Sequence, residues 1–138
     1  MEFLHHHNFL AILTCTLIYF ALGAIWYSKV MFAVKWGAYN KIDFSDTSAK
    51  GMLPTMMIVS FIMMFGAVLG LDTLNHLLGI ANWEGGLKLG ILCGGCFSVA
   101  TMVTSYVYLN KPMGLYFIDG GYHMCGFVIS GVILSVWH

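Results

Sequence analysis

Four apolar stretches, each of about 20 residues and almost free of charge, constrain this chain more than any other feature. They occupy residues 8–27, 53–71, 89–109 and 120–137. A helix rises about 1.5 Å per residue, so about 20 apolar residues cross the hydrocarbon core of a bilayer once. Only 9% of the residues are charged, too few to cover the surface of a soluble domain. The sequence therefore predicts an all-α integral membrane protein, a bundle of four transmembrane helices.

The breaks between the stretches set the domain organisation. Glycines and polar residues separate the second and third stretches, and Asn110-Lys111-Pro112 is a turn signal before the fourth. The first eight residues hold no lysine or arginine, so we expect the first stretch to be a retained anchor rather than a cleaved signal. We predict a single transmembrane domain with spans near residues 8–28, 53–74, 87–109 and 113–137, and a short cytoplasmic segment at 30–51 that lies in the membrane interface.

The lysines predict the orientation of this bundle. In a four-span chain the loops after spans one and three lie on the same side of the membrane. Five of the six lysines fall on that side, and Lys88 falls on the other: the five are Lys29, Lys35, Lys41, Lys50 and Lys111. By the positive-inside rule, both termini then lie on the non-cytoplasmic side. The aromatic belts expected at headgroup depth are Trp26, Tyr27, Trp36 and Tyr108 on the inner side and Trp83 and Trp137 on the outer side. The chain has no basic stripe, which excludes nucleic-acid binding.

A short motif closes the first span, Gly23-Ala24-Ile25-Trp26-Tyr27-Ser28, and Phe32 and Trp36 follow it. Together with Trp83-x-x-Gly86-x-x-x-Gly90 and Gly121-Tyr122-His123, it resembles the small bacterial membrane proteins of the domain-of-unknown-function family numbered 1761, over nearly the whole chain. Members often have proline after the serine, where this chain has Lys29. The resemblance implies a compact multi-span membrane protein, and it supplies no catalytic residues. We expect the protein to lie in the bacterial inner membrane.

Glycines recur every fourth residue on two of the predicted spans. Such faces let helix backbones approach closely in lipid, within one bundle or between copies in a homo-oligomer. We expect these contacts at Gly66 and Gly70 on span two and at Gly86, Gly90 and Gly94 on span three.

Two acid–histidine pairs share an i,i+4 spacing, Asp72 with His76 and Asp119 with His123, so each pair lies on one helix face. Asp72 is about 28 Å along its helix from Leu53, whereas Asp119 is about 10 Å past Pro112. The pairs therefore lie near opposite membrane faces and do not form one site. We expect the Asp72 and His76 side chains to be exposed to water at the membrane surface. We expect Asp119 to be buried and hydrogen-bonded to His123, because ionisable groups inside a membrane mark pathways or buried partners.

The four cysteines fall in one layer of the predicted bundle: Cys15, Cys93, Cys96 and Cys125. Cys93 and Cys96, at i,i+3 on one helix face, have the spacing of a redox pair or of half a thiolate metal site, although cysteine also packs as a small apolar residue. Paired methionines on span two leave copper as a further alternative. The sequence does not decide whether His5, His6 and His7 bind a ligand.

Three functions follow from these patterns. The first is a non-catalytic accessory or structural subunit without a cofactor, surrounded by lipid, in a homo-oligomer or a larger membrane complex. The second is an oligomeric conduit for an ion or small solute that uses Asp119 and His123. The third is a thiol-redox or metal-handling protein that uses Cys93 and Cys96.

Overall fold

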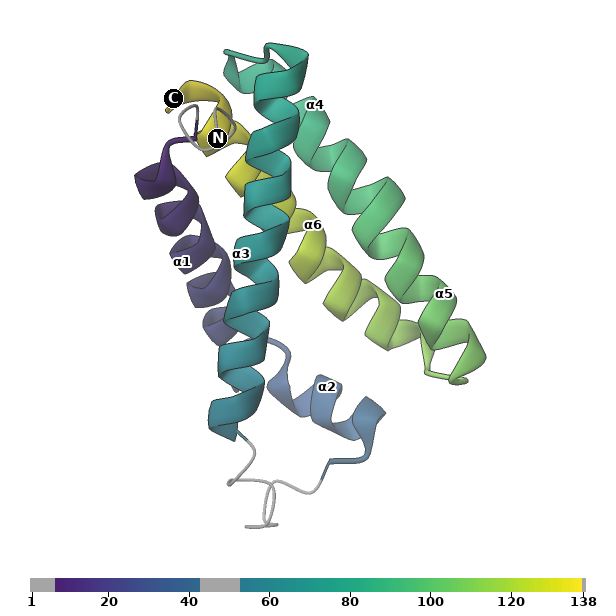
Figure 1. Ribbon diagram of the computed structural model, residues 1–138. Coiled ribbons are helices and arrows are strands. Elements are labelled where there is room, and N and C mark those ends of the chain that lie inside the picture. The colour runs from purple at the N-terminus through teal and green to yellow at the C-terminus, as the bar shows by residue number, and fades with distance from the viewer. Residues whose placement is uncertain (1–6, 43–52, 138) are drawn as a thin grey trace.

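The computed structural model describes residues 7–42 and 53–137, which form helices and connections without any strand (Figure 1). Four helices in these ranges are long and apolar enough to cross a membrane: α1 (Phe9–Trp26), α3 (Leu53–Leu78), the helix Trp83–Tyr108, and α6 (Met113–Val136). A short helix, α2 (Ala33–Asn40), follows α1. The predicted all-α fold of four spanning helices is confirmed.

The third span is one continuous helix with a change of winding in its middle. It consists of α4 (Trp83–Leu92), a π-helical segment (Cys93–Val99) and α5 (Ala100–Tyr108). The π-helical segment contains two adjacent glycines, Gly94 and Gly95, which lack the side chains that stiffen a helical backbone. Its wider turns, with i→i+5 hydrogen bonds, change the faces that the later residues present.

Spans two and three extend further towards each other than the sequence predicts. Helix α3 continues to Leu78 and ends at Gly79, whose φ of 62° is the left-handed conformation that glycine adopts at low cost. Helix α4 begins at Trp83 because the Asn82 side chain accepts a hydrogen bond of 2.8 Å from the Gly85 N–H. The polar residues that suggested a longer loop are thus the caps of two helices.

The two loops predicted to share a side lie at the same end of the bundle. Helix α2 crosses this end, where Lys111 Nζ donates a 2.9 Å hydrogen bond to Asn40 Oδ1, so the turn before α6 meets the segment after α1 (Figure 1). Helix α1 begins and α6 ends at the opposite end. Lys50, predicted to share the side of α2, lies outside the described residues.

Helices α4 and α6 pack closely against each other, because glycines lie at their contact. A Cβ atom on Gly86 would collide with the carbonyl oxygen of Gly131, and one on Gly90 would lie 2.6 Å from that of Phe127. At Gly94 the nearest atom would be the Cβ of Phe127, at 3.1 Å. The glycine face of span three therefore packs inside the chain, on α6.

The glycine face of α3 has different surroundings. Gly66 and Gly70 are exposed, and a Cβ atom at either would meet no atom of the described chain within 4 Å. This face is open to lipid or to another protein.

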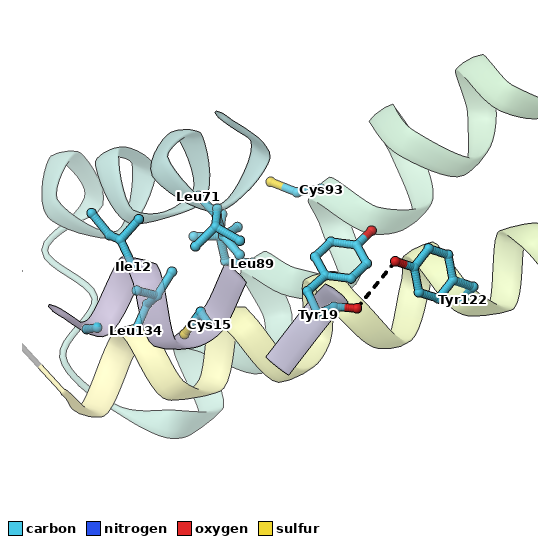
Figure 2. Close-up of a cluster of buried hydrophobic side chains, with 10 residues drawn as sticks. Ile12, Cys15, Tyr19, Leu71, Leu89, Cys93, Tyr122 and Leu134 are labelled. Atoms are coloured by element: carbon cyan, nitrogen blue, oxygen red, sulfur yellow. Dashed lines mark hydrogen bonds between the residues drawn. The ribbon is translucent and has the colours of Figure 1, made fainter. Parts of the chain in front are cut away.

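The apolar core fills the half of the bundle where α1 begins. Figure 2 shows Ile12, Cys15, Leu71, Leu89 and Leu134 packed together there, between α1, α3, α4 and α6. Tyr19 and Tyr122 lie at the edge of this cluster, and the Tyr122 hydroxyl donates to the Tyr19 carbonyl oxygen at 3.3 Å. Beyond these two tyrosines, towards α2, the interior contains the buried carboxyl of Asp119.

Candidate functional site: a buried carboxyl beside an intramembrane cavity

Asp119 on α6 is buried in the half of the bundle that lies towards α2. Its side chain accepts a 2.6 Å hydrogen bond from the Tyr27 hydroxyl at Oδ1 and a 2.7 Å bond from the Tyr106 hydroxyl at Oδ2. Tyr27 directly follows α1 and Tyr106 lies in the last turn of α5. The residue is only 4% exposed, so one buried carboxyl joins three of the four spans.

The predicted hydrogen bond between Asp119 and His123 is wrong. His123 Nδ1 instead pairs with the Tyr19 hydroxyl at 2.7 Å. Although i,i+4 side chains share a helix face, the tyrosines of neighbouring spans reach each of them directly. Gly126 makes this arrangement fit, because a Cβ atom there would overlap the Tyr19 ring.

Glycines beside Asp119 let helix α1 approach α6. A Cβ atom on Gly121 would lie 3.2 Å from the ring of Trp26, and the Trp26 indole N–H donates a 2.9 Å hydrogen bond to the Ile118 carbonyl oxygen. Gly23 faces the Tyr122 hydroxyl in the same way, since a Cβ atom on Gly23 would lie 2.9 Å from that oxygen. Adjacent residues Trp26 and Tyr27 thus both anchor the end of α1 on α6.

A cavity of about 470 Å³ lies beside Asp119, a volume within the usual range for small-molecule sites. Helices α1, α3 and α6 supply most of its lining, with Trp36 of α2 and Tyr106 of α5. Its wall is mainly aromatic and thioether side chains, and six of its residues add polar groups: Ser60, Tyr27, Tyr106, Tyr122, Asp119 and His123. The cavity therefore suits a largely apolar molecule with one polar group.

The second acid–histidine pair lies elsewhere, as the depths along the helices predict. Asp72 Oδ2 is 2.6 Å from Nδ1 of His7, which precedes α1, whereas Asp119 bonds Tyr27, which follows α1. Helix α1 has 18 residues, about 27 Å, between them. The expectation that Asp72 is exposed to water is wrong: the residue is 3% exposed, and its carboxylate contacts His7. The His76 side chain is 36% exposed.

The predicted cysteine layer is divided by burial. Cys15 and Cys93 belong to the apolar core, Cys125 is half-buried, and Cys96 is exposed. All four are free thiols. Cys93 and Cys96 both lie in the π-helical segment, where Cys93 is buried and Cys96 is exposed. Among the described residues, no cluster of three or more metal-ligating side chains includes a thiol.

Sequence reasoning missed Tyr19, Tyr27 and Tyr106 as partners of the polar residues. The sequence predicts Tyr27 in the aromatic belt, yet its hydroxyl donates a hydrogen bond to the buried Asp119. The position of Asp119 along its span could have indicated these partners. It lies near the start of span four, at the end of the bundle where spans one and three end. A buried carboxyl needs donors, and Tyr27 and Tyr106 carry hydroxyls at that level.

The fold and this site define a small four-span helical membrane protein with a polar centre within its bundle. The family model described as protein of unknown function, DUF1761, matches residues 10–135, so the chain belongs to this family, as the resemblance predicts. Two of the motifs that carried the resemblance meet at the site: Trp26 and Tyr27 from one, and Gly121, Tyr122 and His123 from the other. No curated protein and no solved structure matches the chain.

Proposed function

We propose that this membrane protein binds a small amphipathic organic cation in the cavity beside Asp119 and acts as a conduit for it, without catalysing a reaction. The observation that carries the proposal is the Asp119 carboxyl, buried at the cavity wall and held by two tyrosine hydroxyls. Within residues 7–42 and 53–137, the ion pairs involve Asp72 and none involves Asp119. A cationic ligand supplies the opposite charge that a carboxylate inside a membrane requires.

The aromatic wall supports the same class of ligand. Phe20, Tyr27, Trp36, Tyr106 and Tyr122 line the cavity, and none of the lysines in the described ranges does. A cation over the face of a tyrosine or tryptophan ring gains about 0.5–2 kcal/mol, with the larger values at desolvated sites. Methionines of α3, Met56, Met57 and Met64, supply flexible apolar contacts for the rest of the molecule.

The proposal predicts that Asp119→Asn weakens binding of benzyltrimethylammonium by at least about tenfold, because 1.4 kcal/mol of lost charge attraction has that effect. Neopentylbenzene, its uncharged isostere, should bind both proteins equally. Binding is measured in lipid nanodiscs and uptake of the same cation in proteoliposomes. Glu84→Gln, an exposed acid at the start of α4, is the matched control and should leave both unchanged. Equal affinity of the wild type and Asp119→Asn for the cation would refute the proposal.

We further propose that the protein lies in the cytoplasmic membrane with the α2 end inside and both termini outside, as the distribution of lysines predicts. In a Cys96→Ser background, a membrane-impermeant maleimide added to intact cells should label Trp83→Cys and not Val30→Cys. Both positions are exposed, at 56% and 93%, and lie towards opposite ends of the bundle. Labelling of Val30→Cys alone would reverse the orientation.

A second candidate function is an accessory subunit in a homo-oligomer or a larger membrane complex. The exposed Gly66–Gly70 face of α3 favours it, since small residues on a free helix face let another helix approach closely. Native mass spectrometry should then show an assembly that the double variant Gly66→Leu, Gly70→Leu disrupts. A wild-type chain that is monomeric and without partners would contradict this candidate.

A further inference from the structure

Three metal-ligating side chains converge at the end of the bundle where α1 begins. His7 Nδ1 lies 2.6 Å from Asp72 Oδ2, and His76 Nε2 lies 3.6 Å from the same oxygen. One ligand atom from each residue can be chosen so that all three lie within 4.8 Å of one another. His7 precedes α1, whereas Asp72 and His76 are one turn apart near the end of α3. Two separate segments thus bring two imidazoles to one carboxylate oxygen.

We propose that His7, Asp72 and His76 form a binding site for a divalent metal ion of the zinc class. Two imidazole nitrogens and one carboxylate oxygen are a donor set that zinc prefers, and three protein ligands leave a fourth position open. Zinc–nitrogen distances of about 2.0–2.1 Å place tetrahedral ligand atoms roughly 3.3 Å apart. The 3.6 Å separation is already close to this value, and the 2.6 Å hydrogen-bonded separation must lengthen when a metal replaces the shared proton.

The surroundings of the three residues suit a bound ion. The side chains of Asp72 and His7 are nearly inaccessible, at 4% and 3% exposure, whereas that of His76 is 36% exposed and leaves a route for entry. The buried carboxylate therefore offsets one of the two positive charges of the ion, and the ion can enter past the exposed imidazole of His76. Binding there ties the chain before α1 to the end of α3 and stabilises the folded bundle.

An independent observation beside the site also indicates a missing ligand. Asn75, on the same helix turn, is only 3% exposed, and neither its side-chain nitrogen nor its side-chain oxygen has a hydrogen-bond partner among the described residues. With His76 it lines a second cavity, of about 180 Å³. Buried amides are normally hydrogen-bonded, and a water or anion at the open metal position would supply the partner of Asn75.

Zinc titration of the full-length protein tests the site. The protein is purified in detergent without a histidine tag, stripped with a chelator and titrated with zinc chloride in a calorimeter. One zinc ion per chain should bind with a Kd tighter than about 10 µM. Asp72→Asn and His76→Gln should each weaken binding at least about 100-fold, since even residues that only support ligands cost 10–100-fold. His76→Gln is the safer variant, because the side chain is partly exposed.

The control variant is His5→Gln, His6→Gln, which removes two neighbouring histidines that lie outside the described residues and should leave zinc affinity within about threefold. Cobalt in place of zinc should give the visible spectrum of a nitrogen–oxygen site without a thiolate charge-transfer band. The inference is overturned if the wild type binds no zinc, if cobalt shows thiolate ligation, or if zinc affinity depends on His5 and His6 but survives both Asp72→Asn and His76→Gln. Size-exclusion profiles identify any variant that fails to fold.

Discussion

Gly90→Ala is expected to destabilise the bundle by about 2 kcal/mol, and Gly90→Leu is expected to prevent its assembly. The added Cβ atom would lie 2.6 Å from the Phe127 carbonyl oxygen and 2.8 Å from the Val128 Cα. Both atoms belong to the backbone of α6, so no side-chain rotation relieves the overlap and the two helices must separate. The free energy of unfolding, measured by denaturation in mixed detergent micelles, reports the change.

Gly66→Ala is the matched control for Gly90→Ala. Gly66 lies in the interior of a spanning helix too, but a Cβ atom there meets no atom of the described chain within 4 Å. Alanine is still small enough for close helix contact, and it raises helix propensity by up to about 1 kcal/mol. Gly66→Ala should therefore be neutral or slightly stabilising. Equal stability of the two variants would show that α4 and α6 do not pack through Gly90.

Removal of both hydroxyls that bond Asp119, by Tyr27→Phe with Tyr106→Phe, is expected to cost about 2–6 kcal/mol of stability. Each hydrogen bond to the carboxyl contributes roughly 1–3 kcal/mol, and the rings remain to preserve packing. The double substitution leaves the buried carboxyl of Asp119 without hydrogen-bond donors, and this costs more stability than removing the carboxyl together with the hydroxyls. Unfolding in mixed micelles measures the cost.

A double-mutant cycle separates this hydrogen bonding from packing. In an Asp119→Leu background the same tyrosine changes should cost less than about 1 kcal/mol, because the acceptor is gone. Tyr108→Phe, on the same span and 84% exposed, should have no effect in either background. If the tyrosine changes cost as much without Asp119 as with it, the hydroxyls contribute nothing through the carboxyl.

Most of the fold could be predicted from hydropathy because the bilayer imposes it. A spanning helix needs a fixed length of apolar sequence, so the four spans were found from their composition alone. The family resemblance, drawn from short glycine and aromatic motifs, was also correct. The ends of helices were less predictable, because Asn82 can be read either as a loop residue or as a helix cap.

The partners of the buried acid could not be predicted in the same way. Spacing along one helix placed His123 near Asp119, but the hydrogen bonds are decided by which side chains neighbouring helices present. Burial of Asp72 likewise depends on a contact with His7, 65 residues away in the sequence. Spacing describes one helix face, whereas these contacts depend on the rotation of several helices about their axes.

The π-helical segment sets that rotation for the third span. A π turn holds about one more residue than an α turn, so α5 is rotated by roughly 100° for each extra residue, relative to an uninterrupted α-helix. Helix α4 can thus present Gly86 and Gly90 to the end of α6, while α5 presents Tyr106 to Asp119 near its start. A deletion of one residue between 93 and 99 would turn Tyr106 away from the carboxyl and leave α4 in place. Each residue inserted or deleted in this stretch would then rotate the whole of α5 about its axis by a fixed angle, and all of its side chains would change direction together.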